Sequence, residues 1–391
     1  MRRSLLLDLL LLWLTGNALR LTILAVPPVI PLIHTDLDLS ATAVGILGGL
    51  PVLLFAVAAV PGSLLIARLG PVRALVAGLL ATAAFGALRG AVPAVAWLYA
   101  TTILMGAGVA VMQSALPALV STWTPDRAGF ATALYANGLV VGEILPVLLT
   151  IPMVMPLIGG SWQLALALWS LPVFAIAALV QWTRSEAAKG AAVAPARWWP
   201  DWADGLVWRL GLTFGGGTSI YFGANTFLPD HLTSHGRADL VSAALSALNF
   251  GQLPASLVLL PLASRLERRI WPFAVFAFLC LASVVGIAAT ASAWTVLWAG
   301  VLGFAAAGVL VLVLALPPLL CAPAEVASTS AGMLTVAYSL AMAVAVASGA
   351  AWDLSGIPAA AFLPMGACAV LQIAAAATIP FGRRARSNGM E

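Results

Sequence analysis

The chain contains 391 residues, of which 62% are hydrophobic and only 8% are charged. Soluble domains carry about 25% charged residues, so this composition excludes an ordinary soluble protein and predicts an integral membrane protein. The formal net charge of +4 does not indicate nucleic-acid binding, because the basic residues are scattered at predicted loop positions.

Long apolar segments recur from one end of the chain to the other. A helix needs about 20 apolar residues to cross the hydrocarbon core of a bilayer, and the hydropathy pattern predicts about twelve such helices. The predicted segments are 6–33, 41–66, 73–92, 95–120, 129–153, 162–183, 205–229, 241–263, 271–290, 294–320, 328–350 and 358–380. The expected fold class is therefore an all-α membrane protein.

Basic residues are distributed unevenly between the two sets of loops. If the N-terminus is cytoplasmic, nearly all of them fall on cytoplasmic segments, and the opposite side holds Arg237 and Arg89. This positive-inside bias predicts that both termini lie in the cytoplasm. The outer loops are expected to carry acidic and histidine residues instead, namely His34, Asp36, Asp38, Asp230, His231, His235, Asp239 and Asp353.

A polar stretch interrupts the apolar pattern between Arg184 and Trp202. Prolines, small residues and charges are typical of a linker. The sequence therefore predicts an N-terminal six-helix bundle at 1–184, a cytoplasmic linker at 185–202 and a C-terminal six-helix bundle at 203–391.

The two halves resemble each other weakly. Asp38-Leu39 follows the first predicted helix, and Asp239-Leu240 follows the seventh, 201 residues later. Parallel half-repeats joined by a central loop are typical of transporters, whose substrate site lies near the bilayer midplane between the repeats.

The first apolar run carries Asn17 and Arg20 near its middle. A guanidinium at mid-bilayer is unfavourable by at least a few kcal/mol, and arginine does not escape by losing its proton. We therefore expect Arg20 to face a water-filled cavity, a carboxylate or an anionic ligand. Two roles remain open, namely a forked donor for an anionic or nitro group and a structural ion pair.

Glu143 is the one carboxylate that we place deep in a predicted span. Like Arg20, it lies about fifteen residues from the cytoplasmic end of its helix, which gives the two side chains the same depth. Three interpretations compete: a pair with Arg20, a proton carrier, and a ligand for a cationic or hydrogen-bond-donating substrate. They overlap, because a substrate that competes with Glu143 for Arg20 would couple binding to protonation.

Tyr221 and Asn225 lie four residues apart on one face of the seventh predicted helix. The repeat offset places Tyr221 at the position of Arg20, so we predict that it contacts the substrate. Asn225 is expected to serve an outer gate or a bond between helices.

Four further polar residues lie within predicted spans. Gln113 and Tyr338 are equally consistent with substrate contacts and with ties between helices. Asn249 and Gln252 are expected to form interhelical hydrogen bonds. Near the outer end of the third span, Arg89 is expected to snorkel to the interface, with a role in an anion path as the alternative.

No metal site or cofactor is expected. Cys280, Cys321 and Cys368 lack metal-ligand spacing, and the three histidines are external and not paired by spacing. A phosphate-binding G-x-x-x-x-G-K-[ST] loop is absent from the sequence, which argues against direct coupling to ATP.

Four stretches carry a resemblance to a known family: NALRLTILAVPPVIPLI (17–33), GLPVLLF (49–55), MGAGVAVMQSALPALV (105–120) and FGQLPASLVLLPLASR (250–265). They resemble the major facilitator superfamily, and more closely its cyanate/nitroimidazole transporter group. The resemblance implies a transporter of twelve helices in two pseudo-symmetric bundles that works by alternating access. It also implies small substrates, such as inorganic or organic anions or nitro-heterocycles.

One loop departs from the superfamily pattern G-x-L-a-D-r-x-G-r-r. In SLLIARLGPVR, Ser63 replaces the first glycine and Ala67 replaces the aspartate, while Arg68 and Gly70 are kept. The missing aspartate puts a cytoplasmic gate contact in doubt, and Arg68 remains a candidate for gating. The corresponding loop of the second half keeps Arg265, Arg268 and Arg269.

The sequence thus predicts a non-enzymatic secondary transporter in a bacterial inner membrane. The expected partners are a small anionic or nitro-bearing solute, protons and the lipid bilayer, and the expected state is a monomer. The alternative is a drug/proton antiporter that exports small cationic or neutral aromatic compounds.

Overall fold

The computed structural model describes residues 2–57, 65–66, 68–124, 127–184, 199–255, 257–258, 266, 269–321 and 325–380. Its regular elements across these ranges are helices, with no strand. Nine of the described helical segments are long and apolar enough to cross a membrane by length and composition, and Ala41–Val57 is a shorter apolar helix. The predicted all-α membrane fold is confirmed, and the twelve predicted spans are consistent with the helices observed.

The chain divides into two compact units, one formed by Met1–Leu39 and Leu50–Ala194 and the other by Ser40–Gly49 and Pro195–Glu391. Helix α3 (Ala41–Val57) contributes to both units. The predicted linker at 185–202 lies outside the described residues except for 199–202.

The first unit contains α1 (Arg2–Leu24), η1 (Pro27–Val29), α2 (Ile30–Asp36), α5 (Pro71–Leu88), α6 (Val95–Trp123), α7 (Ala128–Leu149), the π-helix η3 (Thr150–Val154), α8 (Met155–Leu157) and α9 (Trp162–Arg184). The second contains α10 (Gly205–Ser234), η4 (Ala238–Leu240), α11 (Val241–Phe250), α13 (Ile270–Ala289), α14 (Ala293–Leu314), α15 (Pro317–Leu320), α16 (Val326–Ser355), η5 (Pro358–Phe362) and α17 (Leu363–Ala377).

The first apolar run is not the single continuous helix that was predicted for 6–33. Helix α1 ends at Leu24, and α2 starts at Ile30 after the short 3-10 turn η1. Pro27 and Pro28 have no N–H to continue the helical ladder. The Val26 N–H instead bonds the Ile23 carbonyl at 3.3 Å, which ends α1 shortly after Arg20.

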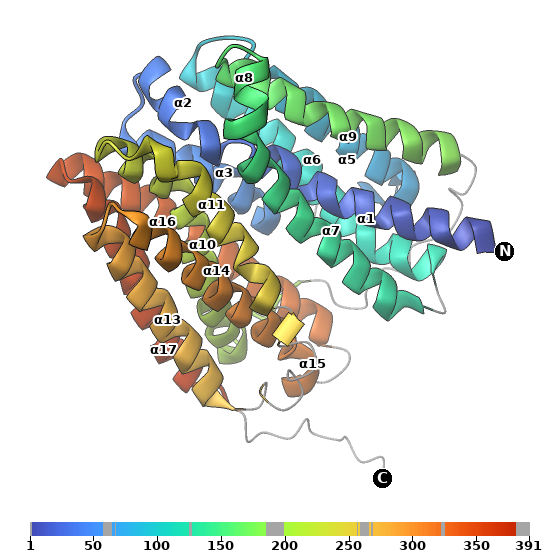
Figure 1. Ribbon diagram of the computed structural model, residues 1–391. Helices are drawn as coiled ribbons and strands as arrows, with labels where there is room; N and C mark the ends of the chain where they lie inside the picture. The colour runs from blue at the N-terminus through green and yellow to red at the C-terminus, as the bar shows by residue number, and fades with distance from the viewer. Residues whose placement is uncertain are drawn as a thin grey trace. The chain divides into compact units, whose positions relative to one another are not determined.

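Helices α1 and α7 pack directly against each other in the first unit (Figure 1). Glycines make this close approach possible, because a Cβ on Gly138 would clash with the Trp13 carbonyl and one on Gly142 with the Asn17 carbonyl. Small residues let helix backbones approach closely in membranes. This packing brings the middle of α1 against the middle of α7.

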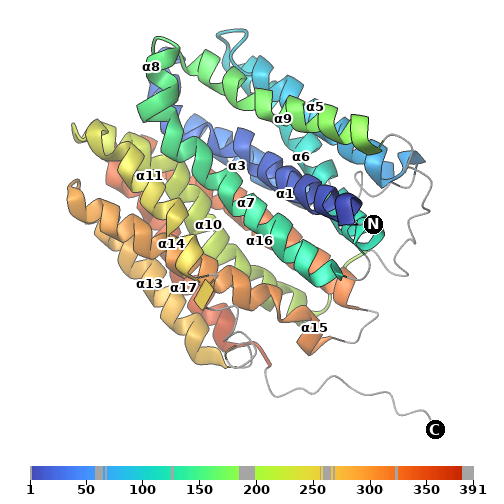
Figure 2. The same cartoon turned by 45° about the vertical axis from the view of Figure 1, so that its right-hand side comes forward.

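Helix α10 is the centre of the second unit, where it packs against α16, α17 and α14 (Figure 2). It is 30 residues long but is not among the nine apolar candidates, because it carries Gly215–Gly217 and several polar side chains. Most of its residues are buried, so these polar groups face protein.

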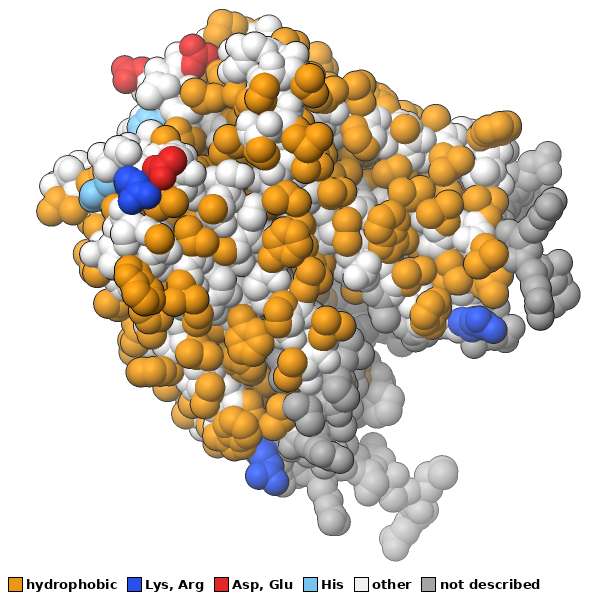
Figure 3. Space-filling view, in the orientation of Figure 1, with side chains coloured by type: hydrophobic (Ala, Val, Ile, Leu, Met, Phe, Trp, Pro, Cys, Tyr) orange, Lys and Arg blue, Asp and Glu red, His pale blue; other side chains and the backbone are white. Residues whose placement is uncertain are grey.

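Few charged side chains interrupt the hydrophobic and neutral surface in the view of Figure 3. Arg237 and Asp239 form an exposed pair in the second unit, with two N–H···O bonds of 3.0 Å from Nε to Oδ1 and from Nη2 to Oδ2. The hydrogen bond from Arg237 holds the pKa of Asp239 below its usual value. This pairing explains how an arginine is accommodated on the predicted outer side.

Candidate substrate site

Arg20 and Glu143 form a buried ion pair in the first unit. Arg20 Nε lies 3.2 Å from Glu143 Oε1, and both residues are buried. Arg20 lies on α1 and Glu143 on α7, at the point where Gly142 allows the two backbones to touch. The structure therefore brings together the two opposite charges that the sequence placed at equal depth.

Phe55 contacts the Arg20 side of the pair, and Asn17, Trp13 and Asn137 form hydrogen bonds on the same two helices, α1 and α7. Arg20 Cζ lies 4.9 Å from the centroid of the Phe55 ring, a cation–π distance. Asn17 donates from Nδ2 to the Trp13 carbonyl at 3.0 Å, and Trp13 Nε1 donates to Asn137 Oδ1 of α7 at 3.0 Å. The sequence alone assigned no role to Phe55, Trp13 or Asn137, although the position of Asn137 near Glu143 in the chain was a usable signal.

Arg89 is completely buried (0% exposed), so the expectation that it snorkels to the interface is wrong. Its Nη2 donates to the Thr22 carbonyl at 2.7 Å and its Nε to the Gly86 carbonyl at 3.3 Å. These carbonyls lie in the last turns of α1 and α5. Each helix C-terminus carries about half a negative charge, so the two ends stabilise the buried guanidinium, whose Nη1 has no hydrogen-bond partner among the described residues.

Thr22 needs this donor because α1 stops early. In a continuous helix the Val26 N–H would bond the Thr22 carbonyl, but it bonds Ile23 instead. Arg89 therefore caps the helix end that follows Arg20 by two residues. It acts as a tie between α5 and α1.

We expect the variant Arg89→Met to lower the free energy of unfolding by about 2 kcal/mol or more, because a buried carbonyl left without a donor costs about 1–3 kcal/mol. Chemical unfolding of the purified protein in detergent measures the change. Arg237→Met is the matched control, since that arginine is half-exposed and pairs with an exposed aspartate, and it should have little effect. Equal losses in both variants would contradict the capping role.

A cluster of buried polar side chains lies in the second unit, on α10, on α11 and, for Gln252, two residues after the end of α11. The Tyr221 hydroxyl donates to Asn249 Oδ1 at 2.6 Å and accepts from Gln252 Nε2 at 3.0 Å. Asn249 Nδ2 donates to Asn225 Oδ1 at 3.1 Å. The structure thus joins four residues that sequence analysis had selected one by one.

The Tyr221 hydroxyl is the central member of that cluster. We expect Tyr221→Phe to destabilise the protein by about 1–3 kcal/mol, since it removes one partner from each of two buried polar groups. Thermal unfolding of Tyr221→Phe and Tyr135→Phe provides the comparison, because Tyr135 is half-buried and lies outside this cluster. An unchanged Tyr221→Phe would show that the hydroxyl is dispensable.

The other predicted residues lie at separate places in their units. Gln113 is half-buried on α6, and its buried Oε1 has no hydrogen-bond partner among the described residues. Tyr338 is buried on α16, with its ring 6.0 Å from that of Phe214 in an edge-to-face arrangement. Arg68 is exposed, whereas Ser63 and Ala67, and likewise Arg265 and Arg268 in the second half, lie outside the described residues.

The expected position of Asp230 and His231 in an outer loop is wrong. Helix α10 continues to Ser234 instead of ending at 229, and both residues are buried within it. The histidines are also not separate, because the His231 and His235 rings lie one helical turn apart with centroids 4.6 Å from each other. Within the described part of the chain, no group of three or more His, Cys, Asp or Glu side chains can hold a metal ion.

The family model of the Major Facilitator Superfamily matches residues 12–346. The chain belongs to this superfamily. It is therefore a multi-pass membrane transporter and not an enzyme, and the fold expected from the resemblance is confirmed.

Three relatives with assigned names are similar over most of the chain. An uncharacterized transporter of Bacillus subtilis is 28% identical over 81% of this chain and 78% of its own length. The 2-nitroimidazole transporter of Escherichia coli is 27% identical over 83% of both chains. The cyanate transport protein of Escherichia coli is 27% identical over 67% of this chain and 68% of its own. The resemblance to the cyanate/nitroimidazole transporter group is confirmed.

Solved structures agree on the fold. A bacterial homolog of the human lysosomal transporter Spinster has a TM-score of 0.72 at 16% identity and covers 96% of both chains. A peptide transporter in complex with sulfate has a TM-score of 0.75 at 15% identity, over 95% of this chain and 94% of that one. At these identities the likeness supports the fold alone.

Proposed function

We propose that this transporter moves a small anionic or nitro-bearing solute by alternating access, coupled to protons, with Arg20 as the anchor for the solute. The observation that carries the proposal is the buried pair of Arg20 Nε and Glu143 Oε1 at 3.2 Å. A guanidinium is the side chain best suited to planar oxygen-bearing groups, because its N–H donors form a rigid fork.

The pair itself supplies a coupling mechanism. An approaching anion competes with the Glu143 carboxylate for the Arg20 guanidinium. Protonation of Glu143 removes its negative charge and leaves Arg20 to the solute. Solute and proton would therefore load together, and the release of either one would favour the return of the ion pair.

The names of two relatives support the solute class, since one is a 2-nitroimidazole transporter and the other a cyanate transport protein. Both solutes are small and carry oxygen atoms able to accept from a guanidinium. Both relatives are bacterial, which with the arginine distribution supports a bacterial inner membrane with both termini in the cytoplasm.

The remaining candidate residues would contact or position the solute as it crosses the protein. Tyr221 and Asn225 in the second unit, with Gln113 and Tyr338, would contact the solute through their hydrogen-bonding groups. Asn249 and Gln252 would hold Tyr221 in place through the bonds described above.

A thermal-shift screen of the purified protein tests the solute class. It compares small anions, including cyanate, and 2-nitroimidazole with cationic and neutral aromatic drugs, on wild type and on Arg20→Gln. The proposal predicts stabilisation of wild type by the first group, lost in Arg20→Gln. Stabilisation by cationic drugs that survives in Arg20→Gln would instead favour a drug/proton antiporter.

A further inference from the structure

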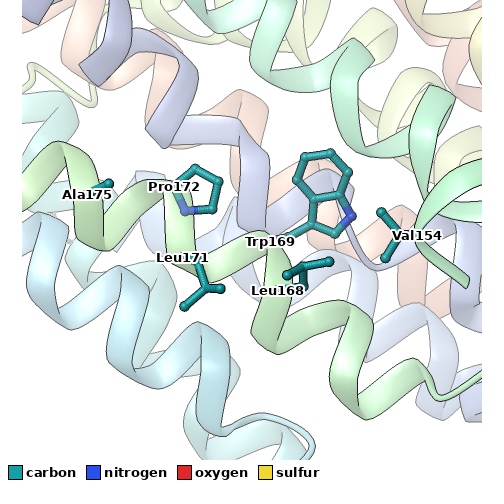
Figure 4. A pocket seen from close by; sticks show the side chains of 6 residues that line it. All are labelled: Val154, Leu168, Trp169, Leu171, Pro172 and Ala175. Carbon is teal, nitrogen blue, oxygen red and sulfur yellow. The ribbon is translucent and has the colours of Figure 1, made fainter. Parts of the chain in front are cut away.

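Gln372 on α17 is a buried side chain whose hydrogen-bonding groups are not used. It is 0% exposed, and neither its Nε2 nor its Oε1 has a hydrogen-bond partner among the described residues. By contrast Trp169, which lines an apolar hollow of the first unit (Figure 4), donates its indole N–H to Thr150 Oγ1 at 2.8 Å. A buried amide without partners is unfavourable, because it has given up its bonds to water and gained none. Gln372 therefore needs an explanation.

The amide of Gln372 lies against the three consecutive glycines of α10. A Cβ on Gly216 would lie 2.6 Å from the Gln372 Cβ and 3.0 Å from its Oε1, and a Cβ on Gly217 would lie 3.8 Å from that oxygen. The side chain that has unused donor and acceptor groups is thus next to the part of α10 that lacks side chains.

Helix packing explains Gly215 and Gly216 but not Gly217. A Cβ on Gly215 would lie 3.0 Å from the Cα of Ala337 on α16, and Gly216 is closed by the Gln372 side chain. On Gly217 the nearest atoms would belong to Val309 at 3.4 Å, which is ordinary van der Waals contact. A methyl group fits there, and alanine is more favourable than glycine inside a helix. Close approach of a neighbouring helix therefore does not require this glycine.

The backbone of α10 is also weakened at this point. Ser219 donates its hydroxyl to the Gly215 carbonyl at 2.6 Å, and such bonds to the preceding turn often bend helices. Because helical bonds join residues four apart, a bend at Gly217 would release the carbonyls of 213–216 and the N–H groups of 217–220. Inside a membrane protein, a helix can break only where neighbouring groups satisfy the backbone that is released.

We propose that Gly217 is the hinge at which α10 bends during transport, and that the Gln372 amide binds the backbone groups that the bend releases. The amide offers one donor group and one acceptor, so it can serve a carbonyl and an N–H. It is unpaired while α10 is straight and paired when α10 is bent, which brings the two conformations closer in free energy. Tyr221 lies one turn beyond the hinge, so bending would re-aim a proposed solute contact. The inference rests on the alternating access proposed above, in which both residues act by positioning.

Hydrogen–deuterium exchange of the full-length protein tests the hinge, with mass spectrometry of the peptides that cover 217–220. In Gly217→Ala we expect these amides to exchange about fivefold more slowly, the ratio that corresponds to the difference in helix propensity between glycine and alanine. Uptake into proteoliposomes should slow to a similar extent, while the Kd for solute stays unchanged. Gly366→Ala on α17 is the matched control, because its Cβ would find its nearest atom at 3.8 Å, and it should change neither rate. Exchange needs no solute, so it tests the hinge even if the proposed solute class is wrong.

A second variant, Gln372→Met, tests the amide. Methionine has a similar length and removes the unpaired groups, so the unfolding temperature should rise. Uptake and the exchange of 217–220 should both slow, because the bent helix loses its partner. A lower unfolding temperature of Gln372→Met would show that the amide is already paired while α10 is straight, for example by a buried water, and would overturn its role. Unchanged exchange of 217–220 in Gly217→Ala would show that α10 does not bend there.

Discussion

Replacement of Arg20 by alanine should abolish solute binding and uptake and should also destabilise the first unit. The variant removes the anchor and leaves Glu143 buried without the guanidinium that lies 3.2 Å away. Removal of one partner from a buried ion pair costs about 3–5 kcal/mol. Chemical unfolding and uptake into proteoliposomes measure the two effects.

A double variant separates the two roles of Arg20. Arg20→Met with Glu143→Met removes both charges and keeps apolar volume, and such replacements of buried pairs are often neutral or stabilising. We expect it to regain the stability lost in Arg20→Ala while uptake remains absent. Recovery of uptake together with stability would show that Arg20 is structural and does not anchor the solute.

The variant Glu143→Gln should lose the response to a proton gradient. Glutamine keeps the size of the side chain and removes the group that gains and loses the proton. For one coupled proton, a gradient of one pH unit supports about tenfold accumulation, so the ratio should fall from about ten toward one. Uptake into proteoliposomes with and without an imposed gradient gives this ratio.

Exchange of labelled for unlabelled solute is the internal control, because it needs binding but no net proton movement. It should persist in Glu143→Gln, and Glu143→Asp should retain the gradient response. Gradient-driven accumulation by Glu143→Gln would remove this residue from the coupling step.

The sequence was sufficient to predict the fold class, and it offered an ion pair of Arg20 and Glu143 as one of three interpretations. Hydropathy and family motifs were enough to predict the fold, because a chain that crosses lipid must satisfy its backbone hydrogen bonds internally and does so in long apolar helices. Equal depth on two predicted helices made the pair of Arg20 and Glu143 a candidate. The solute and the coupling ion stay predictions, because hydropathy and helical periodicity carry no information about either one.

Other features depend on tertiary contacts that no local pattern encodes. Arg89 resembled an interfacial arginine, but the early end of α1 leaves the Thr22 carbonyl for its buried head group, which also bonds the Gly86 carbonyl of its own helix α5. The polar residues of the Tyr221 cluster were visible singly, but their partners lie on another helix. His231 was misplaced because the predicted span ended at 229, whereas α10 continues to Ser234.

Competition between the solute and Glu143 for Arg20 is the central claim, and one binding measurement tests it most directly. Calorimetric titration of cyanate and of 2-nitroimidazole gives the Kd of each compound for wild type and for Glu143→Gln. The account predicts tighter binding by Glu143→Gln, because the competing carboxylate is gone. Weaker or equal binding by Glu143→Gln, or binding of neither compound by either protein, would contradict it.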